Sequence, residues 1–162
     1  MQDGTADGEF RYFMAREWLE DVARMGARCE MAREMVESER AAAAGVSAID
    51  YSRDRVDVSP NGDAMPDAVE RIRARIAKYA QLAVEYEDAR SEAFDALALM
   101  DDSTEALALV KHYLAGKPWT KVADEMGYTV DGVYTLRRRA VADAYCVMPA
   151  SRRVELPDAV GR

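Results

Sequence analysis

Two long stretches of the chain carry apolar or small residues at spacings that alternate between three and four. The first stretch has this pattern at Ala15, Trp18, Val22, Met25, Cys29, Ala32 and Val36. The second has it at Val69, Ile72, Ile76, Tyr79, Ala83, Tyr86, Ala93, Leu97 and Met100, with Arg90 filling one position. A heptad pattern of this kind turns one face of a helix toward a partner helix. The spacing therefore predicts an all-α chain with a long antiparallel helical hairpin of coiled-coil type over residues 10–100.

The composition of the two heptad seams predicts how the hairpin gains stability. The seams contain many alanines and few leucines, so the helices can approach closely but bury a modest apolar area. We therefore expect a homodimer formed through the hairpin, or docking on a partner. Arg90 fits the seam if its aliphatic stem lies along it while the charge reaches water, or if the helix bends or leaves its partner there.

The seams are separated by a loop, at about residues 44–66, which contains two glycines and two prolines as helix breakers. The run from Asp57 to Gly62 resembles the start of a calcium loop, but Ala68 stands where a bidentate acid is required, so we exclude calcium. A connection this long is either a partner contact or disordered, and both readings stay open.

Residues 101–148 carry the pattern of a helix-turn-helix. Asp102 and Glu105 have the spacing of a capping box that opens a supporting helix. We expect the stripe Leu107, Val110 and Leu114 of that helix to meet Val122, Val133 and Leu136. Gly116 and Pro118 then end it, and residues 149–162 are expected to form a loose tail in which Arg152 and Arg153 can touch phosphate.

A short helix from Trp119 to Met126 and a longer one from about Val130 to Tyr145 flank a turn at Gly127. Glycine suits the left-handed conformation that ends a helix, and Thr129 is placed to cap the next one. Along the second helix, a stripe of small and apolar residues should pack on the first helix: Val133, Leu136, Ala140 and Ala144. Two short helices around a glycine turn, the second rich in arginine, are typical of a reader of the DNA major groove.

The candidate DNA-binding residues follow from the faces of these helices. Groove contacts are expected from Thr129, Asp131, Gly132, Tyr134, Thr135 and Arg138. Phosphate contacts are expected from Lys117, Lys121, Arg137 and Arg139. Arginine can donate two hydrogen bonds to guanine, threonine can meet a thymine methyl, and aspartate can accept from cytosine. Asp131 also suits the first turn of a helix without any DNA, and an arginine run is often just a solvated face.

The order Trp119-x-x-Val122-Ala123-x-x-Met126-Gly127-Tyr128-Thr129-x-x-x-Val133-x-x-Leu136-x-x-x-Ala140-Val141 resembles region four of bacterial sigma factors. The chain from about residue 10 to 145 also resembles small phage-encoded proteins that carry this module and are similar to the ArpU and RinA types of late-operon regulators. In that family a polar loop with the pattern of Tyr51–Ser59 lies between two long helical segments. The resemblance implies a phage transcription regulator acting on late genes. Pro118, Asp131 and Gly132 depart from the pattern and bear on which DNA sequence is read.

Charge and composition narrow the classes of function. The net charge of −8 argues against generic coating of nucleic acid, yet residues 111–153 hold 8 basic and 4 acidic residues, a net of +4, which leaves −12 for the rest. No stretch approaches the roughly 20 apolar residues needed to cross a bilayer, and the acidic start of the chain does not predict export. We expect a protein of the host bacterial cytoplasm, with Cys29 and Cys146 as reduced thiols and no membrane partner.

Enzymatic and cofactor-binding classes find little support. Gly116–Thr120 resembles a phosphate loop, but Lys111 stands where its first glycine is needed. His112 is the single histidine, and too few Cys and His residues are present for a zinc site. We therefore predict a protein that is not an enzyme and that needs no cofactor.

Three functions remain open. The first is a sequence-specific regulator whose partners are double-stranded DNA and, through the acidic hairpin, host RNA polymerase. The second is a small terminase subunit, a DNA-packaging component that also combines a helix-turn-helix with coiled-coil assembly. The third is a protein-interaction module whose basic helix is an ordinary surface.

Overall fold

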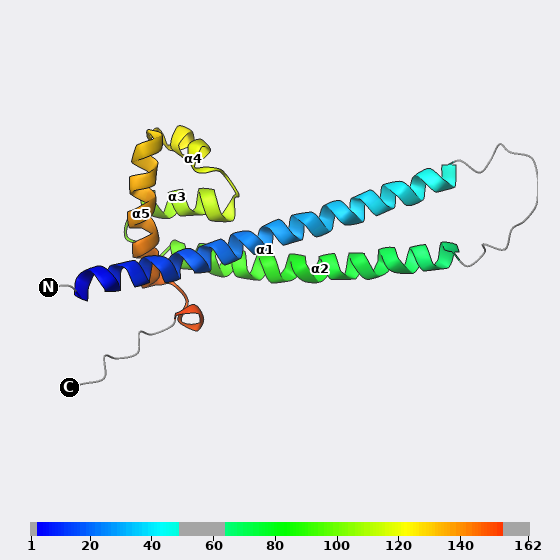
Figure 1. Cartoon of the computed structure of the whole chain (residues 1–162), viewed down its shortest axis with the longest axis horizontal. Helices are drawn as coiled ribbons and strands as arrows, with labels where there is room; N and C mark the ends of the chain where they lie inside the picture. Colours follow the sequence, from blue (N-terminus) through cyan, green and yellow to red (C-terminus); the bar gives the residue numbers. More distant parts are fainter. Residues whose placement is uncertain (1–2, 49–63, 154–162) are drawn as a thin grey trace, which may run out of the picture. The chain divides into compact units, whose positions relative to one another are not determined.

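The computed structural model describes residues 3–48 and 64–153. Within these ranges the protein is all-α: five α-helices, one π-helical turn and one 3₁₀ turn are present, and no strand is (Figure 1). The predicted all-α class is therefore confirmed. Residues 49–63, at the centre of the predicted loop, lie outside the described residues. They include the Tyr51–Ser59 pattern and the run from Asp57 to Gly62 that resembles the start of a calcium loop.

Helices α1 (Asp3–Ala48) and α2 (Ala64–Leu97) contain the two heptad seams. Helix α1 begins before residue 10, where the sequence pattern placed its start, and α2 ends slightly before residue 100. Exposed ion pairs one turn apart support both helices, as between Arg11 and Asp7 at 2.8 Å. Each such pair adds only a few tenths of a kcal/mol, about 0.2–0.5 kcal/mol. The helices therefore depend mainly on what their apolar faces contact.

The chain divides into two compact units, and the smaller one spans residues 25–86. Here the middle and end of α1 meet the first two-thirds of α2. An added Cβ at Gly26 would lie 2.9 Å from the ring of Tyr86, whereas Glu39 forms an ion pair with Arg75. Because the contact nearer the start of α1 is made by the later residue of α2, the two segments run in opposite directions. Seam residues such as Ile72 and Ile76 are half-buried, and Val36 is buried.

The larger unit contains residues 3–24 and 87–153 of the described chain. Its share of the long helices buries Ala15, Trp18, Leu19, Val22, Ala89, Ala93, Ala96 and Leu97. Arg90 does not lie in the seam: it is exposed and pairs with Glu87 at 3.5 Å, while Ala89 is buried beside it. The packing face therefore shifts by one residue at this point, which keeps the charge in water.

Helix α3 (Ser103–Leu109) begins at the predicted place, because the Asp102 side chain accepts hydrogen bonds from the backbone N–H groups of Thr104 and Glu105. The Glu105 half of the predicted capping box does not form in the described part of the chain, since the Glu105 carboxylate pairs with Arg139 instead. The π-helical turn Val110–Leu114 continues it, and Ala115 N–H donates to the Val110 carbonyl at 2.9 Å. This turn aligns residues five apart, so Leu109 and Leu114 are both buried.

The predicted stripe on this helix is partly wrong. Leu107 is 47% exposed, and the buried face contains Glu105, Ala108 and Leu109 instead. Glu105 is a charged residue, and such residues are seldom fully buried unless they are paired. The structure buries it because an arginine from another helix pairs with it. Because Glu105 and Leu109 face the core, Leu107 between them faces solvent.

Helices α4 (Trp119–Met126) and α5 (Val130–Val147) complete the larger unit, followed by a 3₁₀ turn, Ala150–Arg152. Helix α5 contacts both α3 and α4, which makes it the central element of this part of the fold. Among the described helices, each one is too short or too polar to traverse a lipid bilayer.

Candidate nucleic-acid interface

The turn between α4 and α5 is held by two local devices. Gly127 adopts a left-handed conformation with φ of 71°, its N–H donates to Asp124, and the Tyr128 N–H donates to the Ala123 carbonyl at 2.9 Å. These bonds close the end of α4 in a Schellman arrangement. The Thr129 hydroxyl then accepts from the Gly132 N–H at 3.0 Å and starts α5. The predicted bounds of α4, the glycine turn and the threonine cap are all confirmed.

Helix α5 has one buried and one exposed face. The predicted inward stripe of Val133, Leu136, Ala140 and Ala144 is buried, and Val141 joins it. Asp131, Thr135 and Arg138 are exposed on the other side, and Tyr134 is 45% exposed. A helix packed along one stripe thus presents a mixed polar and aromatic outer surface.

Thr129, Gly132 and Thr135 have clear local roles. An added Cβ at Gly132 would lie 3.0 Å from the Thr129 hydroxyl oxygen, so glycine accommodates the cap. The Thr135 hydroxyl donates to the Asp131 carbonyl at 3.1 Å. That bond occupies its single donor, leaving the oxygen lone pairs and the methyl group for other contacts. Thr129, by contrast, accepts in its cap and keeps its own O–H to donate.

Arg138 and Arg139 are neighbours with different environments. The Arg139 guanidinium pairs with Glu105 and lies 3.6 Å from Asp102, which ties α5 to the start of α3. Burial raises the pKa of Glu105, and the pairing with Arg139 opposes that rise. No ion pair or hydrogen bond joins the Arg138 side chain to another residue of the described ranges. Of the two arginines, Arg138 is the one available to a ligand.

The two candidate lysines also have acidic partners. Lys111 and Lys117 both bind the Glu125 carboxylate, at 2.6 and 2.7 Å, and these two ammonium groups lower the pKa of Glu125 to about 2. Lys121 is 55% exposed and lies 3.3 Å from Asp124. Exposed pairs of this kind are weak, worth about 0–1 kcal/mol, so Lys121 can exchange its partner for a phosphate. Lys117 would first have to leave a shared carboxylate.

Arg137 belongs to an aromatic cluster that the sequence did not reveal. Its guanidinium lies over the Trp119 ring, 5.4 Å from the centroid. His112 stacks on the same Trp119 ring, with the two ring centroids 4.2 Å apart, and the His112 Nδ1 lies 2.7 Å from the Lys117 carbonyl oxygen. Burial lowers the pKa of His112, which is therefore a structural histidine that favours the neutral form. The buried Nε of Arg137 has no hydrogen-bond partner among the described residues.

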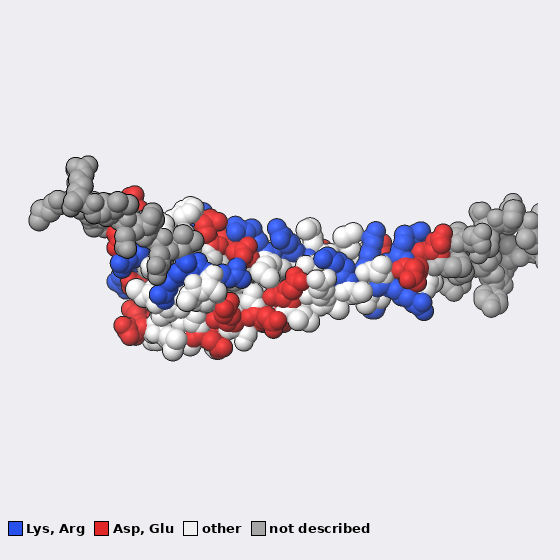
Figure 2. Space-filling view, turned by 90° about the horizontal axis from the view of Figure 1, so that it is seen from below, with Lys and Arg blue, Asp and Glu red and all other residues white. Residues whose placement is uncertain are grey.

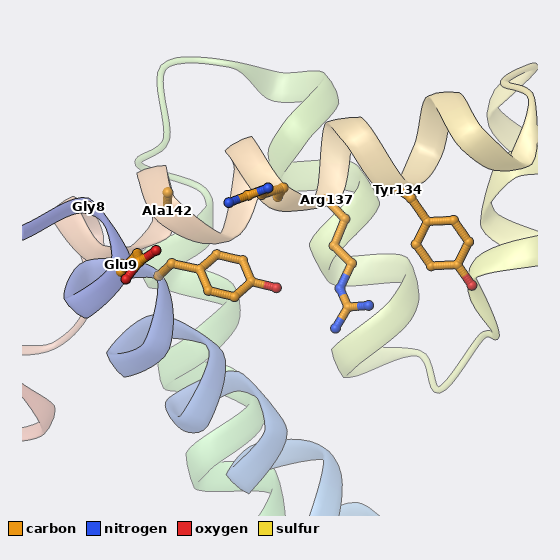
Figure 3. A pocket seen from close by; sticks show the side chains of 7 residues that line it. Gly8, Glu9, Tyr134, Arg137 and Ala142 are labelled. Atoms are coloured by element: carbon orange, nitrogen blue, oxygen red, sulfur yellow. The ribbon is translucent and has the colours of Figure 1, made fainter. Parts of the chain in front are cut away.

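A pocket of about 670 Å³ opens beside α5, and the start of α1 forms its other wall. It is lined by Gly8, Glu9, Tyr12, Tyr134, Arg137, Arg138 and Ala142. Figure 3 shows Glu9 on the α1 side and Tyr134 and Arg137 projecting from α5. Nearby, Phe10 packs edge-on against Tyr145 at 6.4 Å. The sequence could not indicate this contact, since the two walls are more than 120 residues apart in the chain.

The start of the predicted loose tail is tied to the fold. Arg152 lies 3.6 Å from Asp21, and Arg153 donates to the carbonyls of Met148 and Cys146. These contacts engage both arginines that were expected to be free for phosphate. Residues 154–162 lie outside the described residues.

Basic and acidic side chains are interspersed on the face that Figure 2 shows. That face therefore has no continuous basic surface of the kind that binds a polyanion. Four of the eight basic residues between positions 111 and 153 pair with carboxylates on α3 or α4, namely Lys111, Lys117, Lys121 and Arg139. The arrangement suits a local contact with a shaped ligand better than sequence-independent coating. Among the described residues, no group of three or more Cys, His, Asp or Glu is arranged to hold a metal ion.

Comparison of the chain with protein-family models, with curated proteins and with solved structures gives no match.

Proposed function

We propose that the protein is a sequence-specific double-stranded DNA-binding regulator of transcription, in which α4 and α5 form a helix-turn-helix and α5 enters the major groove. The resemblance to sigma region four and to phage late-operon regulators supports a role at phage late genes. Helix α5 carries the supporting observation: it is packed along one stripe and leaves Thr135 and Arg138 exposed on the other.

In this proposal the predicted DNA-binding residues have different roles. Asp131, Tyr134, Thr135 and Arg138 make the groove contacts, while the Thr129 hydroxyl and Lys121 contact phosphate. Arg139 and Lys117 chiefly stabilise the unit, because each already has a carboxylate partner. Arg137 has a stacking role on Trp119 and reaches a ligand through its remaining N–H groups.

Arg138→Ala tests the groove assignment. The loss of a bidentate base contact is expected to weaken binding to a selected site by about 1–3 kcal/mol and to relax discrimination at one base position. Arg40→Ala is the matched control, because it removes the same charge from an exposed position of α1. Fluorescence anisotropy on cognate and scrambled duplexes measures both. Equal affinity of Arg138→Ala and wild type would refute the assignment.

Lys121→Ala tests the phosphate contact separately. It is expected to weaken binding to every duplex. The slope of log K against the logarithm of the salt concentration should become smaller in magnitude by about 1. A change confined to the cognate sequence would instead place Lys121 in the groove.

We further propose that the long helices form an antiparallel hairpin that dimerises the protein, with host RNA polymerase as a second partner. A modest core and exposed Met31, Met35 and Val84 support an additional packing surface. Light scattering at known concentration tests the dimer. A ring of many subunits would favour a packaging role of the small-terminase kind, and a monomer would remove the dimer from the account.

A further inference from the structure

The pocket between the start of α1 and the outer side of α5 combines features that a small charged ligand requires. Its volume, about 670 Å³, lies within the range of sites for small organic molecules, roughly 300–1,000 Å³. Two adjacent arginines and two tyrosines line it. Such a set offers charge-assisted hydrogen bonds together with flat aromatic faces.

The arginines of the pocket stand out because neither has a carboxylate partner among the described residues. In a chain with 30 acidic and 22 basic residues, most described arginines and lysines of the larger unit have carboxylate partners, as Arg16 has in Glu20. Arg137 and Arg138 have none within the described residues. The Nε of Arg137 is moreover buried without a hydrogen-bond partner, and a buried donor left unpaired is costly. An anion in the pocket would accept hydrogen bonds from the accessible N–H groups of the two guanidinium groups.

The tyrosines define the rest of the ligand. Tyr134 is 45% exposed and Tyr12 is half-buried, and they come from opposite walls. A planar ring between or against them would cover apolar surface that water now contacts, and stacking of a base on an aromatic side chain contributes about 1–3 kcal/mol. A nucleoside monophosphate carries both groups, a planar base for the tyrosines and an anionic phosphate for the arginines.

We propose that this pocket binds a nucleoside monophosphate, with the phosphate held by Arg137 and Arg138 and the base against Tyr12 and Tyr134. Glu9, which also lines the pocket, opposes the phosphate by like charge and limits affinity. Because Tyr134 and Arg138 are also assigned to DNA, the ligand competes with DNA for α5; this consequence rests on the proposed function, whereas the binding itself does not.

Isothermal titration of the full chain with AMP, adenosine and orthophosphate tests the ligand class without any DNA. Saturable binding of AMP is expected, with adenosine and orthophosphate each weaker by about tenfold or more, since each lacks one half of the recognised group. No saturable binding at millimolar AMP would overturn the proposal. So would equal binding of AMP and orthophosphate, because the tyrosines would then have no role.

Matched variants locate the site. Arg138→Gln should weaken AMP binding about tenfold, and Tyr134→Ala about fivefold or more. Arg40→Gln and Tyr128→Ala are the controls, since both residues are exposed and neither lines the pocket. Glu9→Gln should strengthen binding, a change of opposite sign that a purely structural role would not produce. Loss of affinity in the controls equal to that in the pocket variants would overturn the location.

A competition experiment then separates this inference from the proposed function. AMP should release a selected duplex from the wild type, and Glu9→Gln, a pocket variant with no assigned DNA contact, should need less AMP for the same release. If the protein binds AMP but no DNA, the proposed ligand site stands and the proposed DNA-binding function is refuted. If it binds DNA but no AMP, the proposed DNA-binding function stands and the proposed ligand site is refuted.

Discussion

The two compact units use the same kind of helix in different ways. In the larger unit, large side chains from several helices share one core, and Leu19, Leu97, Leu109 and Val133 are fully buried. In residues 25–86, Val36 is the one buried apolar side chain among the described residues, and it is not fully enclosed, since 5% of its surface is exposed. Two paired helices cover only one face of each other, whereas a third and fourth element enclose a residue from all sides. Stability is therefore expected to reside in the larger unit, and surface for partners in the smaller one.

The largest expected effect contrasts a core leucine with a methionine of the smaller unit. Leu109→Ala removes a fully buried side chain and should lower the free energy of unfolding by about 2–5 kcal/mol. Met35→Ala, at a position 51% exposed, should change it by less than about 0.5 kcal/mol in the monomer. Urea unfolding followed by circular dichroism measures both. Similar costs at the two positions would remove the distinction between the units.

The second effect separates two adjacent arginines of the larger unit. Arg139→Met leaves the buried Glu105 without its partner and should cost on the order of 2 kcal/mol, moderated because Arg139 is 65% exposed. Arg138→Met should leave stability within about 0.5 kcal/mol and reduce DNA binding instead. Thermal melts paired with anisotropy titrations test this, and the reverse pattern would exchange the two roles.

A third effect concerns the turn between α4 and α5. Gly127→Ala forces a side chain into the left-handed region and should destabilise the unit by about 1–2 kcal/mol. Gly8→Ala is a useful control, because an added Cβ there meets nothing within 4 Å and its φ is not positive. Comparable loss at both glycines would show that the turn geometry is not what matters.

The smallest effect is the contribution of Glu125 to acid stability. Its pKa falls from 4.5 to about 2 in the folded state, first through its hydrogen bonds to Lys111 and Lys117. A lowered pKa stabilises the folded form above the unfolded value, and that stabilisation disappears as the pH falls from about 4.5 to about 2. Glu125→Gln should flatten this part of the stability profile. An unchanged profile in that variant would mean that the two lysines do not hold the carboxylate in solution.

The elements predicted correctly from the sequence are those with local causes. The bounds of α4, the left-handed Gly127 and the Thr129 cap depend on residues within one turn of each other. The inward stripe of α5 follows from helical periodicity alone. These features therefore needed no knowledge of the rest of the fold.

The features missed by the sequence depend on residues far apart in the chain. The burial of Glu105 and the exposure of Leu107 follow from Arg139, which is 34 positions away from Glu105. The ion pair of Arg152 with Asp21, 131 positions away, likewise has no compositional signal. The pocket needs the start of α1 beside α5, which neither heptad spacing nor charge predicts. Tertiary contacts thus decide which of several similar arginines is free.

The central claim, that α5 reads a DNA sequence, is tested most directly by selecting bound duplexes from a random pool with the full-length protein at near-physiological salt. The account predicts an enriched motif, with a two-fold repeat if the hairpin dimerises the protein. The motif selected by Arg138→Ala should lose its base preference at one position. Salt-sensitive binding with no enriched sequence would contradict it.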